Sequence, residues 1–450
     1  MKQVLTGIAC ILLTVPLDAQ VPPAFTSLTL DEAIARGMET SRRLAELQSR
    51  EEAAAFAVEG RHVAERPNVA VQGGYTRTNH VDEFVITSPV RPPQVVYADI
   101  PDNYRTRLDL QWPIYTGGRG DALERAARAE QAATGEDLAA ARSDLRLEIT
   151  RAFWALVTAR ETEAVLARSL DAIGAQVADL RSRLASGLIA PNDVSSAEAQ
   201  ASRQRLLALE AANQRAIAEA DLRRLTGVPA GRIDVRVPEA DTRVPGTVTV
   251  TVRVPPTVPD SGRSVSVPVS TRPERRALEQ RARSADARAD AVDATGRPQI
   301  AVGGGYDYAR PNPRIFPRTG QWRTSWDVSI NLTWSLWDGG RRGADAGEAR
   351  ANARAVRARA EDFDRQATFE IEQRQLELAS NREAIGAADD EVRAAVDAER
   401  VVGERYRVGV ATSTDVLEAQ VTRLQAELDR TRAIAGVRLA EARLQRALGQ

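Results

Sequence analysis

The residue types that most often carry out catalysis are sparse in this sequence. Its two histidines, His62 and His80, have no carboxylate or nucleophile at the spacing of a catalytic motif, and we interpret both as exposed single residues. The glycine clusters Gly303–Gly305 and Gly117–Gly120 interrupt or end strand-like patterns, and neither is followed by the lysine of a phosphate-binding loop. We therefore expect a protein that is not an enzyme, with no cofactor and no metal site.

Other polar side chains stand where helices are expected to begin. Asp415 is followed three residues later by Glu418, which is the spacing of a capping box for the last helix. Asn192 and Asp193 are equally suited to cap an earlier helix, because their oxygens accept hydrogen bonds from the free N–H groups of a first turn. These four residues therefore have a purely structural interpretation, which is compatible with a further role.

The composition favours long packed helices. The 450 residues include 61 Lys+Arg and 62 Asp+Glu, a net charge of -1 that gives no general attraction for nucleic acid. The mean hydropathy of -0.34 excludes a membrane protein built from many apolar helices. Because aromatic residues are only 4% of the chain, alanine and leucine must do most of the packing.

The first residues have the pattern of a signal peptide. Lys2 is followed by an apolar stretch from Val4 to Val15 and by the small residue Ala19 before the expected cleavage. We therefore expect residues 1–19 to direct the protein out of the cytoplasm. Cys10 lies inside the apolar stretch, too near Lys2 to act as a lipid acceptor, so we expect no lipidation.

The chain contains a tandem repeat. We expect a first repeat over residues 20–227, a linker over 228–271 and a second repeat over 272–450. The matching landmarks are Arg66–Tyr75 with Arg297–Tyr306, Trp112–Arg119 with Trp334–Arg341, Gly187–Val194 with Gly409–Val416, and Leu225–Gly227 with Ala447–Gly449. The linker is rich in Val, Thr and Pro, and it is read either as short strands around a helical barrel or as an extended connector.

Each repeat reads as helix, two strands, long helix, turn and helix. In the first repeat we expect helices over 31–65, 121–186 and 193–226. At about 1.5 Å per residue the long helix measures about 100 Å, which two stacked shorter helices of about 50 Å would match. A heptad seam of apolar residues follows the long helix and recurs in the last helix: Leu166, Leu170, Ile173, Val177, Leu180 and Leu184, then Leu417, Val421, Leu424 and Leu428.

Two segments alternate between apolar and polar residues as strands do. The apolar positions are Tyr104, Thr106, Leu108, Leu110, Trp112 and Ile114 in the first, and Trp326, Val328, Ile330, Leu332, Trp334 and Leu336 in the second. Transmembrane barrels use such segments, but so does an antiparallel sheet that packs one face on a soluble core. Four strands cannot close a barrel, so several chains would have to share one.

The strand-ending motifs Tyr115–Arg119 and Trp337–Arg341, the two turns Gly187–Val194 and Val408–Ala419, and their order resemble the TolC-type outer-membrane efflux proteins. The resemblance covers nearly all of the chain after the signal peptide. It implies an α+β membrane protein in which three chains form a barrel of long coiled-coil helices in the periplasm. It also implies a shared, twelve-stranded antiparallel β-barrel in the outer-membrane lipid.

The resemblance also implies functional positions. Asp415 and Glu418 match acidic positions that ring the narrowest part of the pore, where carboxylates favour cations and can raise each other's pKa. Tyr406 and Asp193, beside Asn192, match residues that hold the tip closed, whereas an arginine of some relatives is replaced by Ala411. The turn residues expected to face a periplasmic adaptor are Gly187, Leu188, Ala190, Gly409, Val410, Thr412 and Ser413.

Two classes of function therefore remain at the level of the sequence. The first is the passive outer-membrane channel of a tripartite efflux or secretion system, which works with an adaptor and an inner-membrane pump. The second is a periplasmic coiled-coil scaffold or adaptor with a small β domain. The Pro-rich segment 79–102 is expected to be a loop that faces the cell exterior, with a shorter counterpart at 311–321.

Overall fold

The computed structural model describes residues 26–229, 233–237 and 271–450, and the chain divides into two compact units. Unit 1 comprises Met1–Ser41, Glu148–Pro255 and Ser380–Leu439, and unit 2 comprises Arg42–Leu147, Pro256–Ala379 and Ala440–Gln450. Each unit therefore takes segments from both repeats. The expected signal peptide with Cys10, and most of the expected linker, lie outside the described residues.

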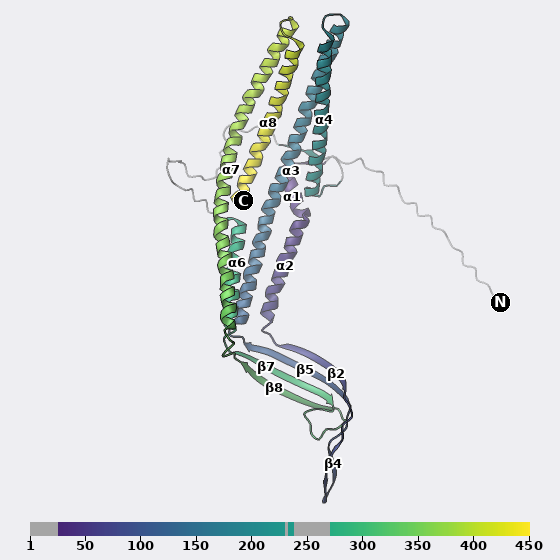
Figure 1. The fold of residues 1–450 in the computed structure, drawn as a ribbon, viewed down its shortest axis with the longest axis vertical. Helices are drawn as coiled ribbons and strands as arrows, with labels where there is room; N and C mark the ends of the chain where they lie inside the picture. The colour runs from purple at the N-terminus through teal and green to yellow at the C-terminus, as the bar shows by residue number, and fades with distance from the viewer. Residues whose placement is uncertain (1–25, 230–232, 238–270) are drawn as a thin grey trace, which may run out of the picture. The chain divides into compact units, whose positions relative to one another are not determined.

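Long helices dominate both units (Figure 1). They are α1 (Leu30–Thr40), α2 (Arg42–Val63), α3 (Arg119–Ala185), α4 (Pro191–Thr226), α6 (Pro273–Ala294), α7 (Arg341–Arg407) and α8 (Ser413–Ala447). The helices expected over 121–186 and 193–226 are confirmed as α3 and α4. The helix expected over 31–65 is instead two helices, because Ser41 adopts an extended backbone with ψ 115°. The apolar pattern continues through this break, so periodicity could not reveal it.

The predicted heptad seam forms part of the core of unit 1. Along α3, the side chains of Leu166, Ile173 and Leu180 are at most 3% exposed, and they pack against α4 and α8. On α8, Leu417 and Leu424 are buried, but Val421 is 39% exposed. The seam is therefore confirmed on α3 and is only partly covered on α8 within one chain.

The core of unit 2 is built largely from alanine. Buried alanines recur at intervals of one heptad along α7, at Ala346, Ala353, Ala360 and Ala367. Further buried alanines lie on α3 and α6, among them Ala122, Ala126, Ala133, Ala277, Ala287 and Ala291. Small side chains allow helix axes to approach closely, so this core confirms that alanine takes over the packing that aromatic residues provide elsewhere.

A four-stranded antiparallel sheet belongs to unit 2 (Figure 1). Its strands are β2 (Asn68–Arg77), β5 (Asp102–Tyr115), β7 (Gln299–Arg310) and β8 (Arg323–Thr333), in the order β2-β5-β7-β8. The two repeats meet where β5 pairs with β7, with Leu108 opposite Tyr306. Strands β2 and β8 are the edges of this sheet.

The apolar face of the sheet is uncovered within the chain. Trp326, Val328, Ile330 and Leu332 of β8 are between 65% and 74% exposed, and Val69 and Val71 of β2 are 60% and 69% exposed. A sheet that packed on a soluble core would bury these side chains. The exposed apolar face therefore contradicts the soluble-sheet interpretation and favours a face that meets lipid.

Aromatic side chains border this apolar face at both ends of the strands. At the end near the loops, neighbouring rings are in contact, with centroids 5.0 Å apart for Tyr75 and Tyr104, and 4.8 Å apart for Tyr308 and Trp322. At the end near the helices the exposed aromatic side chains are Trp112, Tyr115, Trp334 and Trp337. Such belts lie at the two interfaces of transmembrane barrels.

The strand boundaries differ from the expectation in two places. Strand β8 begins at Arg323 and ends at Thr333, so Trp334 and Leu336 follow it, and the indole of Trp334 donates to the carbonyl of Gly296 at 3.1 Å. The segment expected to be a loop contains a hairpin, β3 (Phe84–Ser88) and β4 (Arg91–Tyr97). Two prolines lie in β4, which tolerates them because each of these strands has only one partner.

In unit 1, β1 (Thr26–Leu28) pairs in parallel with β6 (Ile233–Val235). The expected linker therefore contains at least one short strand. Across the described ranges, no helix combines the length and the apolar composition that crossing a membrane requires.

Candidate functional site

The two predicted turns of unit 1 have the same backbone geometry. At the end of α3, Gly187 has φ 71°, and the N–H of Leu188 donates to the carbonyl of Arg183 at 3.0 Å. At the end of α7, Gly409 has φ 79°, and the N–H of Val410 donates to Arg405 at 2.8 Å. Both are Schellman motifs, in which glycine supplies the left-handed residue that stops the helix. The two repeats therefore end their long helices, α3 and α7, in equivalent turns.

The cap of α8 is a capping box, but not the predicted one. The N–H of Asp415 donates to the hydroxyl of Thr412 at 3.2 Å, and the N–H of Thr412 donates to the Asp415 carboxylate at 2.7 Å. The box therefore joins Thr412 and Asp415, because α8 begins at Ser413, one turn earlier than an Asp415–Glu418 box requires. Glu418 lies inside the helix and takes no part in the cap.

The cap of α4 also differs from the prediction. The N-cap residue is Ala190, which has no side-chain hydrogen bond, and Pro191 occupies the first helical position. Asn192 and Asp193 therefore lie within the first turn and do not cap it. Proline is suited to this position because its missing N–H needs no partner there, and the carboxylate of Asp193 still favours the positive end of the helix dipole.

Asp415 and Glu418 are exposed on one face of α8, one turn apart, while the intervening Val416 and Leu417 are buried. The hydrogen bond from the backbone of Thr412, followed by the one with its hydroxyl, holds the pKa of Asp415 below its ordinary value. Within one chain the cap thus acts against the rise in pKa that neighbouring carboxylates would cause.

Tyr406 lies in the last turn of α7, against the apolar cluster of α3, α4 and α8. The guanidinium of Arg183 lies 4.9 Å from the centre of its ring, and Arg183 itself is bonded to Asp179 at 2.8 Å. Within the described residues the buried hydroxyl of Tyr406 has no hydrogen-bond partner, so the expected bond to Asp193 is not made within one chain. Sequence reasoning missed Arg183, which carries no motif of its own.

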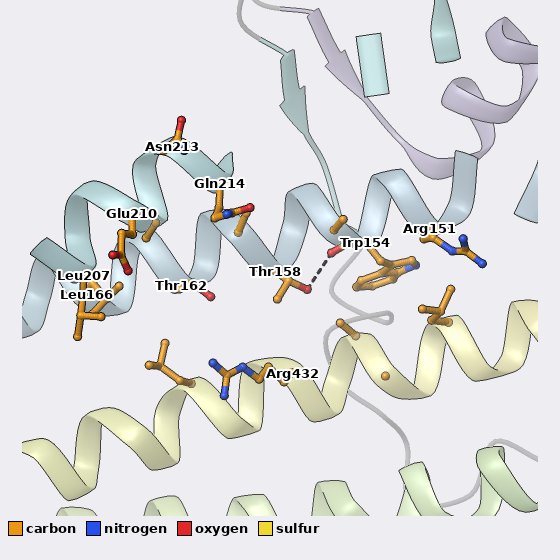
Figure 2. Close-up of a pocket in the computed structure, with 17 residues that line it drawn as sticks. Arg151, Trp154, Thr158, Thr162, Leu166, Leu207, Glu210, Asn213, Gln214 and Arg432 are labelled. Carbon is orange, nitrogen blue, oxygen red and sulfur yellow. Dashed lines mark hydrogen bonds between the residues drawn. The ribbon is translucent and has the colours of Figure 1, made fainter. Parts of the chain in front are cut away.

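A cavity of about 940 Å³ opens farther along unit 1, between α3, α4 and α8 (Figure 2). Its wall combines apolar side chains such as Trp154, Leu207 and Leu439 with the charged Arg151 and Arg432. The seam residues Leu166 and Leu428 border it, and none of the predicted tip residues does. The cavity therefore marks a place where the helices of one chain separate.

Each histidine has an acidic neighbour, which corrects their interpretation as single residues. His62 Nδ1 lies 3.4 Å from Glu124, and His80 Nδ1 lies 2.6 Å from Asp99. These neighbours are distant in sequence, so motif spacing could not show them. In the part of the chain that the structure describes, no group of three or more potential metal ligands is brought together.

The fold is similar to that of solved outer-membrane channels. VceC from Vibrio cholerae has a TM-score of 0.74 at 19% identity, covering 93% of this chain and 96% of that one. MtrE from Neisseria gonorrhoeae has a TM-score of 0.72 at 20% identity, covering 93% and 88%. CmeC from Campylobacter jejuni has a TM-score of 0.74 at 15% identity, covering 93% and 85%.

Comparison by sequence gives a family. No curated protein matches this sequence. The family profile described as outer membrane efflux protein matches residues 34–228 and 269–450, one segment for each repeat. The match covers most of the chain and includes both helical tips and all four strands of the sheet, so the chain belongs to the family of outer membrane efflux proteins.

Proposed function

We propose that three copies of this chain form the passive channel of a tripartite efflux or secretion system. The observation that carries the proposal is the sheet, which has an exposed apolar face, aromatic belts and two open edges. An open edge in lipid would leave backbone groups without hydrogen bonds, so the four strands require partners from other chains. Three chains supply twelve strands, which is enough for a closed barrel.

The exposed turns support a docking role at the periplasmic tip. Leu188 is 73% exposed and Val410 is 65% exposed, and they occupy equivalent positions after the two left-handed glycines. We propose that these turns meet a periplasmic adaptor, which links the channel to an inner-membrane pump. The proposed contact residues are Gly187, Leu188, Ala190, Gly409, Val410, Thr412 and Ser413.

We further propose that the exposed acidic face of α8 forms the pore constriction and that Tyr406, Asp193 and Asn192 form contacts that close the tip. Three copies of Asp415 and Glu418 would place six carboxylates around one axis, which favours cations. The hydroxyl of Tyr406 has no hydrogen-bond partner within the described residues, so a hydrogen bond to Asp193 in the closed tip would satisfy it. The channel would carry small molecules or proteins from the periplasm to the exterior without chemical change.

The full-length protein, expressed in a Gram-negative host, tests this function. We expect extraction from the outer membrane only with detergent, a trimer that dissociates on heating in SDS, and ion conductance after reconstitution into planar bilayers. A monomer released by osmotic shock would instead support the scaffold alternative. Copurification of an adaptor and a pump would identify the system to which the channel belongs.

A further inference from the structure

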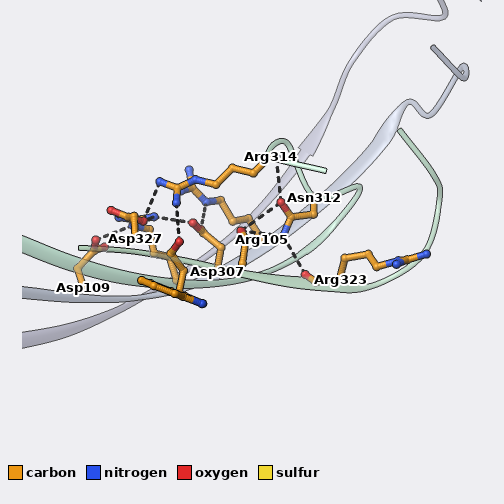
Figure 3. A network of polar contacts seen from close by, with 10 residues as sticks. Arg105, Asp109, Asp307, Asn312, Arg314, Arg323 and Asp327 are labelled. Atoms are coloured by element: carbon orange, nitrogen blue, oxygen red, sulfur yellow. Dashed lines mark hydrogen bonds and ion pairs between the residues drawn. The ribbon is translucent and has the colours of Figure 1, made fainter. Parts of the chain in front are cut away.

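The polar face of the sheet carries an ion-pair network, which takes no part in the functions proposed above for the helical tips (Figure 3). Arg107 of β5 is its centre and contacts carboxylates on three strands. Its Nε lies 2.6 Å from Asp109 of β5, and its Nη1 lies 2.5 Å from Asp307 of β7 and 3.1 Å from Asp327 of β8. One guanidinium therefore joins three strands of the sheet.

Two further arginines complete the network. Arg105 Nε donates to Asp307 at 2.6 Å, and Arg314, from the loop after β7, lies 2.7 Å from Asp327. We call Arg105, Arg107, Asp109, Asp307, Arg314 and Asp327 the Arg107 network. It contains three guanidinium groups and three carboxylates, so its charges balance.

The backbone provides a place for the central guanidinium. Gly305 of β7 lies between Asp109 and Asp327 in the register of the sheet. A Cβ atom at Gly305 would lie 2.1 Å from Nη2 of Arg107. Because glycine has no side chain, Arg107 can extend across β7 and reach Asp327 on the next strand. The side chain of Asp307 beneath it is only 1% exposed.

The network lies at the depth of the apolar band. Arg107 and Asp109 are on β5 between Tyr104 and Trp112, which belong to the two aromatic belts. Their side chains alternate with the apolar ones of the same strand and so point to the opposite face. If the apolar face meets lipid, the Arg107 network faces the interior of the barrel.

We propose that Arg107 sets the ionic selectivity of the channel at the level of the β-barrel, because its charge completes the balance of a network whose carboxylates would otherwise attract cations. This inference rests on the proposed function, since it requires that the polar face line the conduit. With the charges balanced, the barrel admits ions of either sign. Loss of Arg107 leaves one carboxylate per chain uncompensated, and three chains would place these charges around one lumen, where their fields add.

The test is the reversal potential of reconstituted trimers in a KCl gradient. We expect R107Q to raise the ratio of K⁺ to Cl⁻ permeability severalfold. The double variant R107Q/D109N restores the charge balance and should return the ratio toward that of the wild type. R91Q is the matched control, because it removes the same charge from the hairpin strand β4 outside the sheet, and it should change the ratio little.

The variant D327N provides an independent arm, should R107Q fail to assemble. It removes a carboxylate from an edge strand and should shift the permeability ratio toward Cl⁻. Conducting trimers of R107Q or D327N with the wild-type ratio would overturn the inference, as would an R107Q/D109N ratio equal to that of R107Q. A wild-type protein that forms no channel would refute the proposed function itself, so the two failures are distinguishable.

Discussion

The side chain of Asp415 is hydrogen-bonded within its own chain, at the start of α8. Its carboxylate accepts the N–H of Thr412, and this hydrogen bond holds the pKa of Asp415 below its ordinary value. The sequence suggested a capping role for this residue but paired it with the wrong partner, because a capping box can be placed only when the first residue of the helix is known. Because the cap joins Thr412 and Asp415, the charge of Glu418 can be removed without disturbing the cap.

This separation gives a prediction about the proposed constriction. Thr412→Ala removes the cap and no charge, so it should lower the free energy of unfolding by about 1 kcal/mol and leave cation selectivity unchanged. Glu418→Gln removes a charge outside the cap and should weaken cation selectivity, and adding Asp415→Asn should weaken it further. Thermal unfolding and reversal potentials measure the two effects. Wild-type selectivity in the double variant would leave capping as the only role.

A second residue-scale prediction concerns acid stability. Burial by itself would raise the pKa of Glu274, but the hydrogen bond from Arg446 and the charges of Arg446 and Arg272 hold that pKa below its ordinary value. The ionised carboxylate therefore stabilises the fold above the usual carboxyl range of about 4.3, and this contribution is lost as the pH falls through the lowered pKa.

We therefore expect the midpoint of thermal unfolding to fall between pH 7 and pH 3.5, and to fall less in Glu274→Gln. At pH 7 that substitution should cost about 1–3 kcal/mol, since it weakens a hydrogen bond to a charged group. Glu279→Gln is the control, because Glu279 pairs with Arg283 on the surface of the same helix. An acid response in Glu274→Gln equal to that of the wild type would contradict the assignment.

At the scale of the elements, periodicity predicted most of what the structure contains. The heptad seam of α3 and the alternation of β5 are local properties of the chain, and they located these elements to within a few residues. The break at Ser41 was missed because the helical spacing of apolar residues continues through it. The β3–β4 hairpin was missed because its residues do not alternate regularly between apolar and polar. Element ends depend on local hydrogen bonds that periodicity does not report.

We expect the two faces of β8 to differ in how well they tolerate a charged side chain, and substitutions at two neighbouring residues test this. Val328→Arg places a charge on the apolar face and should cost about 2–4 kcal/mol near the middle of the bilayer, which lowers the yield of assembled protein in the outer membrane. Ser329→Arg, on the opposite face, should assemble nearly normally. Equal yields of heat-labile assembly from the two variants would show that neither face meets lipid.

At the scale of the whole molecule, the described chain leaves two sheet edges unpaired and apolar side chains exposed. The edge strands β2 and β8 each have a single partner in the sheet, and Val421 on the helical seam remains exposed. These observations support the proposed contacts with other copies of the chain.

The proposed gate is a property of this assembly. Because the Tyr406 hydroxyl makes no hydrogen bond in the described chain, Tyr406→Phe should leave the packing of a single chain nearly unchanged. Combined with Asp193→Ala, it should raise single-channel conductance by removing the contact proposed to hold the tip closed. Planar-bilayer recording of the double variant, beside each single variant, measures this. Conductance equal to that of the wild type would remove the gate assignment.

The sequence by itself determined the repeat, the long helices, the alternation of the strands and the equivalence of the two tips. These features depend on the spacing of residues that are close in the sequence, so the sequence alone reveals them. Only the tertiary structure decided that the apolar face of the sheet is uncovered, that Arg183 lies over Tyr406, and that Arg107 joins aspartates about 200 residues away. Such partners depend on the register between distant strands and helices, which no local pattern specifies.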